Sequence, residues 1–169
     1  MTIFSTTNFI VRQFTIEDAD NFYFLNSNPE VLRYIRPIKT KKECNAFLNE
    51  QLQEYKSQPS MGRWLVADKS TNHFIGTFSI LFMQGDVDYH IGYALMPNHW
   101  GKGYATDLLQ QGVKYFCKNF TSKQLFAITQ KENIASEKVL DKVGFKLCGS
   151  ITRVDEVLNL FAFESIGNR

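Results

Sequence analysis

The sequence has few cysteines, few prolines and no long hydrophobic run. Its three cysteines form no CxxC pair and its three histidines lack the spacing of metal ligands, so we expect no metal site. We expect Cys44, Cys117 and Cys148 to be free, buried and structural, as is usual in a reducing compartment. No stretch has the length and hydrophobicity of a membrane span, and the first residues lack the pattern of a signal peptide. These absences predict a cytoplasmic protein with no membrane partner.

The chain also lacks an excess of charge of either sign. It carries 19 Lys and Arg against 17 Asp and Glu, a net charge of +2. Nucleic-acid binding depends on many contacts between basic side chains and phosphates, so this balance argues against a nucleic-acid partner. The length suits one domain over residues 1–169, and 15 Phe and 7 Tyr can supply its core. The sequence does not choose between a monomer and a homodimer.

Alternating and helical patterns of apolar residues divide the chain into strands and helices. Strands are expected at residues 8–14, 63–69, 73–83, 87–96, 123–130, 145–151 and 156–164, and helices at 16–26, 28–35, 41–56, 104–116 and 133–143. Thr40 and Glu43 form a capping box before the third helix. Short turns predict an antiparallel meander in the middle, and a helix between residues 87 and 130 requires one parallel strand pair. The fold class is therefore α+β, with a mixed, mostly antiparallel sheet of about seven strands flanked by helices.

The segment NHWGKGYATDLL, residues 98–109, places Gly101 and Gly103 at the start of a helix, although glycine inside a helix costs about 1 kcal/mol relative to alanine. The first amides of a helix have no intrahelical acceptor and lie at the positive end of its dipole, where they bind anions. Glycine lets the backbone approach a phosphate and adopt positive φ, and Lys102 adds charge. The segment is neither a P-loop nor a dinucleotide fingerprint. These residues alone leave open a phosphate site or a tight turn without a ligand.

A second motif, TQKENIASEKVLDKVGF, occupies residues 129–145. With IGYALMPNHWGKGYATDLL before it, the chain resembles GNAT-family N-acetyltransferases, in particular the branch of ribosomal-protein N-terminal acetyltransferases. The first segment resembles the family's Q/R-x-x-G-x-G/A motif, and NIASEKVLDKVGF its N-x-x-S…K-x-GF motif. The resemblance is close over residues 90 to 149. It implies a single GNAT domain with a cofactor core at about residues 86–149 and a splay between the central strands.

The resemblance implies that acetyl-CoA is the co-substrate. The glycine loop would bind its pyrophosphate, and the preceding strand would pair with its pantetheine arm. The implied cofactor-binding residues are Leu95, Met96, Trp100, Gly101, Lys102, Gly103, Tyr104, Ala105, Asn133 and Ser136. Trp100 replaces the customary Gln or Arg. Asn133 could serve as a helix cap alone, and Leu95 and Met96 could be ordinary core residues.

The resemblance further implies direct attack of a primary amine on the thioester, with a strand amide near Ala94 or Leu95 stabilising the oxyanion. His90 stands where the branch often has a glutamate, and an unperturbed histidine, with a pKa of about 6.5, suits a general base. Its alternative is a half-buried strand histidine. Many relatives have a tyrosine acid at the position of Leu140, so here Ser136 or solvent would protonate the departing thiolate. The alternative is that Ser136 is an exposed helical serine without this role.

Four carboxylates remain reserve bases that could act through water: Asp86, Asp88, Asp155 and Glu156. The acceptor could be a protein N-terminus or a small amine, in a pocket built from residues 27–60 and the last two strands. Two alternatives stay open. One is an acyl-CoA-binding module without turnover, and the other is an acetyltransferase acting on aminoacyl-tRNA.

Overall fold

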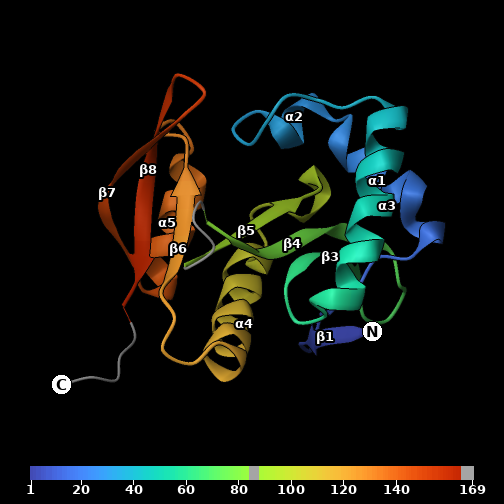
Figure 1. Cartoon of the computed structure of the whole chain (residues 1–169), viewed down its shortest axis with the longest axis horizontal. Coiled ribbons are helices and arrows are strands. Elements are labelled where there is room, and N and C mark those ends of the chain that lie inside the picture. Colours follow the sequence, from blue (N-terminus) through green and yellow to red (C-terminus); the bar gives the residue numbers. More distant parts are fainter. Residues whose placement is uncertain (84–87, 165–169) are drawn as a thin grey trace.

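The computed structural model describes residues 1–83 and 88–164. In this part of the chain, eight strands form one sheet in the order β1-β2-β3-β4-β5-β6-β8-β7 (Figure 1). The strands are β1 (Thr2–Ser5), β2 (Phe9–Arg12), β3 (Gly62–Asp68), β4 (Phe74–Phe82), β5 (Tyr89–Leu95), β6 (Leu125–Thr129), β7 (Phe145–Arg153) and β8 (Glu156–Phe163). The helices are α1 (Ala19–Asn26), α2 (Pro29–Leu32), α3 (Lys41–Ser57), α4 (Tyr104–Asn119) and α5 (Ile134–Val143). The α+β prediction is confirmed, with β1 as a strand that the sequence did not reveal.

Local signals set the helix boundaries. The Glu43 amide donates to the Thr40 hydroxyl at 3.3 Å and the Glu43 carboxylate accepts from the Thr40 amide at 2.7 Å, so the predicted capping box begins α3. Asn28 caps α2 by accepting from the amide of Glu30 at 3.0 Å. Gly144 ends α5 with φ +103°, in the left-handed region that glycine tolerates.

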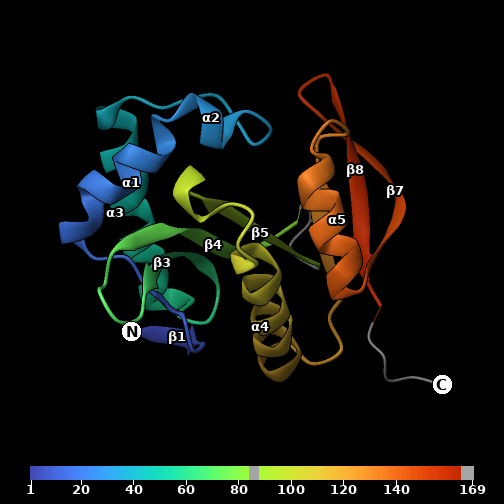
Figure 2. The ribbon, with the colours of Figure 1, turned by 180° about the vertical axis from the view of Figure 1, so that it is seen from behind.

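The helices cover opposite faces of the sheet. Figure 1 shows α3 in front of the central strands, whereas α4 and α5 lie in front in the reverse view of Figure 2. On the α4 face, a Cβ added to Gly112 would lie 2.3 Å from the ring of Phe78, so glycine lets α4 approach the sheet closely. On the α3 face, the Tyr55 hydroxyl donates to the carbonyl of Arg63 in β3. Trp64, Phe78 and Ile80 are fully buried between these layers.

The two central strands separate after a short contact. β5 and β6 are parallel and pair only at Tyr89–Leu125 and His90–Phe126. Beyond His90 the two strands diverge, and no strand of the described chain lies beside the rest of β5 on that edge (Figure 1). This confirms the predicted parallel pair and splay. His90 therefore lies where the strands part.

The cysteine prediction is wrong in part. Cys44 is buried in α3, but Cys117 and Cys148 are exposed. Cys117 lies on the solvent side of α4, and Cys148 lies in β7, an edge strand whose residues 146–150 are all exposed. No helix in the described ranges combines the length and hydrophobicity that a membrane crossing requires.

Candidate active site

The glycine loop joins the end of β5 to the start of α4. Gly101 has φ +67° and Gly103, the N-cap of α4, has φ +81°. Both values lie in the left-handed region, which side chains with a branched Cβ avoid. A Cβ added at either glycine would meet no other atom within 4 Å. The glycines therefore provide the backbone conformation, and they leave the outer surface of the loop open.

The loop presents unpartnered amides on this open surface. The amides of Gly101, Lys102 and Gly103 donate to no acceptor among the described residues. The carbonyl of Gly103 accepts from the amide of Asp107 at 3.1 Å, so the amides of the first turn, from Tyr104 on, also lack intrahelical acceptors. α4 is 16 residues long, and its dipole is positive at this end. The arrangement is suited to binding a phosphate.

Trp100 ties the loop to the preceding strand. Its indole Nε1 donates to the carbonyl of Leu95 at 2.7 Å, while its side chain stays 44% exposed. The Met96 amide donates to Ile75 in β4, and the Met96 carbonyl accepts from the His99 amide, both at 2.9 Å. Because backbone groups alternate between the two edges of a strand, Leu95 and Tyr93 face the open edge. Of the two predicted pantetheine residues, Leu95 is therefore the one placed to pair with a ligand.

The side chains of the first turn pack against the N-terminal strands. The Tyr104 ring lies 6.1 Å from the Phe9 ring and 5.4 Å from the His99 ring, measured between centroids. Ala105 is half-buried against the core, whereas Lys102 is exposed. Tyr104 and Ala105 thus offer their amides to a ligand, and Lys102 can offer its charge.

The second motif lies beside β5 and brings an unpredicted pair together. Asn133 caps α5, its side-chain oxygen accepting from the Ser136 amide at 3.3 Å, so its cap interpretation is confirmed. The Ser136 hydroxyl lies 3.2 Å from the hydroxyl of Tyr93. Leu140 is buried in the core. Tyr93 stands inside the IGY segment, and period-two alternation with the buried Ile91 would have placed it on the helix-covered face.

The Tyr93 hydroxyl is protonated at neutral pH, as a general acid must be. Burial raises the pKa of its hydroxyl, and the hydrogen bond with Ser136 opposes this only in part. Tyr93 therefore keeps its proton at neutral pH and can donate it. Its hydroxyl lies on the α5 face of β5, next to the open edge.

His90 is a far weaker base than the sequence suggests. Burial lowers its pKa to about 4, with further lowering by the positive charges of Arg153 and Arg63. The expectation of an unperturbed value near 6.5 is wrong, because the fold buries the imidazole and also brings Arg153 of β7 and Arg63 of β3 near it. At pH 7 His90 is neutral and can accept a hydrogen bond, but it has little affinity for a proton.

Three of the four reserve carboxylates lie in the described residues. Asp155 and Glu156 are exposed at the tip of the β7–β8 hairpin, with Asp155 at φ +65°. Asp88 is half-buried just before β5, and Asp86 lies outside the described residues.

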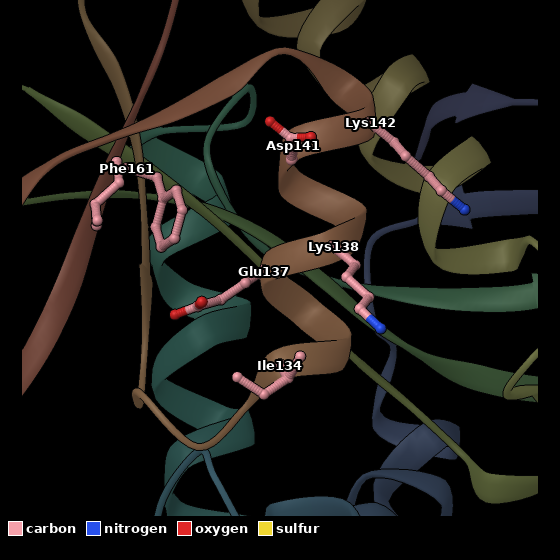
Figure 3. Close-up of a pocket in the computed structure, with 7 residues that line it drawn as sticks. Ile134, Glu137, Lys138, Asp141, Lys142 and Phe161 are labelled. Atoms are coloured by element: carbon pink, nitrogen blue, oxygen red, sulfur yellow. The ribbon is translucent and has the colours of Figure 1, made fainter.

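A surface pocket between α5, β7 and β8 shares no residue with the predicted cofactor site. Its lining residues are Ile134, Glu137, Lys138, Asp141, Lys142, Leu147 and Phe161. Figure 3 shows Glu137 directed toward Phe161, with Lys138 and Lys142 directed away. The Glu137 carboxylate accepts from Thr129 at 3.1 Å and from Asn159 at 2.7 Å, so it joins α5 to the sheet. We assign this pocket no role in acetyl transfer.

Comparison with known proteins decides the family. The family model described as "Acetyltransferase (GNAT) domain" matches residues 8–146. The chain belongs to the GNAT acetyltransferase family. The expectation of an acetyl-CoA-dependent N-acetyltransferase is confirmed at the level of this family. A curated relative, the uncharacterized N-acetyltransferase YoaA of Bacillus subtilis, is 27% identical over 147 residues, covering 85% of this chain and 82% of its own.

Solved structures confirm the GNAT fold. A GNAT-family acetyltransferase from Bacillus anthracis has a TM-score of 0.82 at 24% identity, over 96% of this chain and 98% of its own. The ribosomal L7/L12 α-N-protein acetyltransferase RimL, in complex with coenzyme A, has a TM-score of 0.79 at 16% identity, over 96% and 97%. At these identities the likeness establishes the fold.

Proposed function

We propose that this GNAT protein moves the acetyl group of acetyl-CoA to a primary amine by direct attack, the acceptor being a small amine or a protein N-terminus. The observation that carries the proposal is the row of unpartnered amides at Gly101, Lys102 and Gly103, beside the open edge of β5. The coenzyme A complex of the RimL neighbour supports the choice of cofactor. That neighbour is also the support for a place near the ribosomal-protein branch.

In this proposal the cofactor spans three groups of residues. The loop amides and the first turn of α4, Gly101 to Ala105, bind the pyrophosphate, with the charge of Lys102 nearby. Leu95 and Tyr93 pair with the pantetheine arm along the open edge of β5. The side-chain oxygen of Asn133 accepts the capping hydrogen bond from the Ser136 amide, so its side-chain NH₂ group can donate to the pantetheine arm. Residues 1–169 act as one domain with this core at about 86–149, and the cytoplasm remains the compartment predicted from the sequence.

The proposed chemistry uses the hydroxyls of Tyr93 and Ser136, on the α5 face of the sheet. As the amine attacks the thioester carbonyl, an amide of β5 stabilises the oxyanion, and the carbon–sulfur bond then breaks. Tyr93, whose raised pKa keeps it protonated, donates its proton to the departing thiolate. Ser136 orients the Tyr93 hydroxyl across their 3.2 Å contact and can relay a proton from water to it, which replaces the proton that the thiolate takes. The amine loses its own proton to water, because His90 binds protons too weakly.

The Tyr93–Ser136 pair also bears on the alternatives. An acid placed beside the open edge favours turnover over a module that only binds acyl-CoA. No observation in the described residues favours aminoacyl-tRNA as the acceptor. The direct test is release of free thiol from acetyl-CoA by the purified protein with a panel of primary amines. Thiol release that depends on an added amine supports the proposal. If none of the amines in the panel causes thiol release, the proposal is contradicted.

The state of His90 predicts the shape of the pH profile. His90 is neutral above its pKa of about 4 and charged below it, so a limb due to His90 should appear near pH 4. Between pH 6 and 8 it should cause no bend. We expect His90→Ala to lower kcat/KM about tenfold through a lost hydrogen-bond acceptor, with an unchanged profile between pH 6 and 8. His90→Asn, which keeps an acceptor, is the matched control. A wild-type bend near pH 6.5 that His90→Ala removes would contradict this assignment.

A further inference from the structure

One row of residues crosses the sheet on the face opposite α4. Arg63 in β3 pairs with Ser79 in β4, and Ser79 pairs with Gly92 in β5. Directly opposed residues of paired strands point to the same face, and residues two apart on one strand also share it. Arg63 therefore projects to the face that also carries His90. A Cβ added at Gly92 would meet only the Ser79 hydroxyl, at 3.3 Å, so no other described residue comes within 4 Å of β5 at that position.

Arg63 is charged and half-buried, and it forms no ion pair among the described residues. Its Nε has no contact with solvent and no hydrogen-bond partner in the described structure. Its guanidinium carbon lies 5.9 Å from the centroid of the Phe47 ring. Burial, together with the charge of Arg36, lowers its pKa to about 9, so Arg63 still carries its proton at pH 7. A guanidinium whose Nε is shielded from solvent without a partner loses solvation there, and an anionic ligand would compensate for that loss.

Arg36, in the segment after α2, is held in place without being neutralised. Its Nη2 and Nε donate to the side-chain oxygen of Asn26 at 2.8 Å and 3.3 Å. Asn26 is 1% exposed, and its own NH₂ group donates to the carbonyl of Phe22 at 2.8 Å. Because the amide is neutral, this network fixes the position of the guanidinium and leaves its charge in place.

No carboxylate in the described ranges balances these charges. The ion pairs formed there are Arg12–Asp18, Lys41–Asp20 and Lys146–Asp141. None of them includes Arg36 or Arg63. Arg153, near the tip of the β7–β8 hairpin, adds a further positive charge that acts on His90. In Figure 1 the tip of this hairpin and α2 both lie above β5, with the hairpin on the left.

We propose that the acetyl acceptor carries a carboxylate or phosphate group besides its amine, and that Arg63 and Arg36 bind this anion on the face of β5 opposite α4. The proposal rests on the proposed function and narrows it. A guanidinium offers a planar fork of donors that matches either anion. The uncovered surface at Gly92 places the amine near the thioester while the anion lies toward β3. The same charges repel polyamines, which carry several positive charges.

The test uses amines matched in pairs on the full-length protein. Each of several amino acids is compared with its α-amide, and O-phosphoethanolamine with ethanolamine, by thiol release from acetyl-CoA. We expect the anionic member of at least one pair to be favoured by about thirtyfold or more in kcat/KM. The pair that shows the preference identifies carboxylate or phosphate. Arg63→Gln should reduce that preference at least tenfold, with acetyl-CoA affinity unchanged, whereas Arg63→Lys should restore part of it. Lys118→Gln, an exposed change of equal charge on α4, is the control.

The outcomes separate the two proposals. If neutral amides and ethanolamine react as well as their anionic partners, or if Arg63→Gln keeps the preference, the inference is overturned while the proposed function stands. If no amine of either class causes thiol release, both the inference and the proposed function are overturned. A melting temperature of Arg63→Gln equal to or above wild type would show a folded variant. A folded Arg63→Gln is expected because the substitution removes a half-buried charge whose Nε has no hydrogen-bond partner.

Discussion

Replacing Gly103 with valine is expected to weaken acetyl-CoA binding about a hundredfold. The residue has φ +81°, a conformation that costs an ordinary L-residue about 1–2 kcal/mol and a β-branched one more. The new side chain would also project into the open surface above the loop, where the pyrophosphate is proposed to bind. Calorimetric titration of wild type and Gly103→Val with acetyl-CoA measures the difference.

Two further variants make this result specific. Gly149 in β7 has open space around its Cβ position and no positive φ, so Gly149→Val should bind acetyl-CoA like wild type. Asparagine tolerates the left-handed backbone conformation, so Gly103→Asn should keep the fold while placing a side chain over the amides of the glycine loop. Wild-type affinity in a folded Gly103→Val protein would remove the loop from the cofactor site.

Replacing Tyr93 with phenylalanine is expected to lower kcat by tenfold to a hundredfold with little change in acetyl-CoA affinity. The variant keeps the ring and loses the proton donor, and a positioned acid typically contributes at least this much. If Tyr93 and Ser136 act as one unit, Tyr93→Phe with Ser136→Ala should be no slower than Tyr93→Phe alone. Steady-state kinetics with a saturating amine measures both.

The pH dependence of the wild-type activity is a second test of the role of Tyr93 as an acid. Burial raises its pKa above the ordinary 10, and the protonated form is the active one. Activity should therefore fall only as pH rises through that raised value, and Tyr93→Phe should lose this alkaline limb. Tyr115→Phe is the control, because its hydroxyl donates at 2.9 Å to the carbonyl of Ser60, away from this site. A kcat for Tyr93→Phe within twofold of wild type would show that the pair is structural.

Features encoded by neighbouring residues could be predicted from the sequence. The capping box of Thr40 and Glu43, the positive φ of Gly101 and Gly103, and the cap at Asn133 each depend on a few adjacent residues. The parallel pair of β5 and β6 followed from the helix that connects them. β1 escaped prediction because its four residues are too short for a clear alternation and gain their place by pairing with β2.

Features that depend on distant residues could not be predicted. Tyr93 and Ser136 are 43 positions apart and meet only because α5 packs beside β5. The low pKa of His90 comes first from burial and then from the charges of Arg153 and Arg63, which the fold brings near it. Sequence spacing carries no information about such electrostatic neighbours. The residue type alone therefore suggested an ordinary pKa for His90, which the folded chain lowers.

The most direct test of the account is calorimetric titration of the wild-type protein with acetyl-CoA, paired with thermal unfolding. At a ligand concentration about a hundred times Kd, binding should raise the free energy of unfolding by about 2.7 kcal/mol. For a chain of this length that corresponds to roughly 5–10 °C in Tm. Saturable heat together with that shift is the predicted result. Neither heat nor a shift at millimolar acetyl-CoA would contradict the account, since the amides at Gly101 to Gly103 would then form a turn without a ligand.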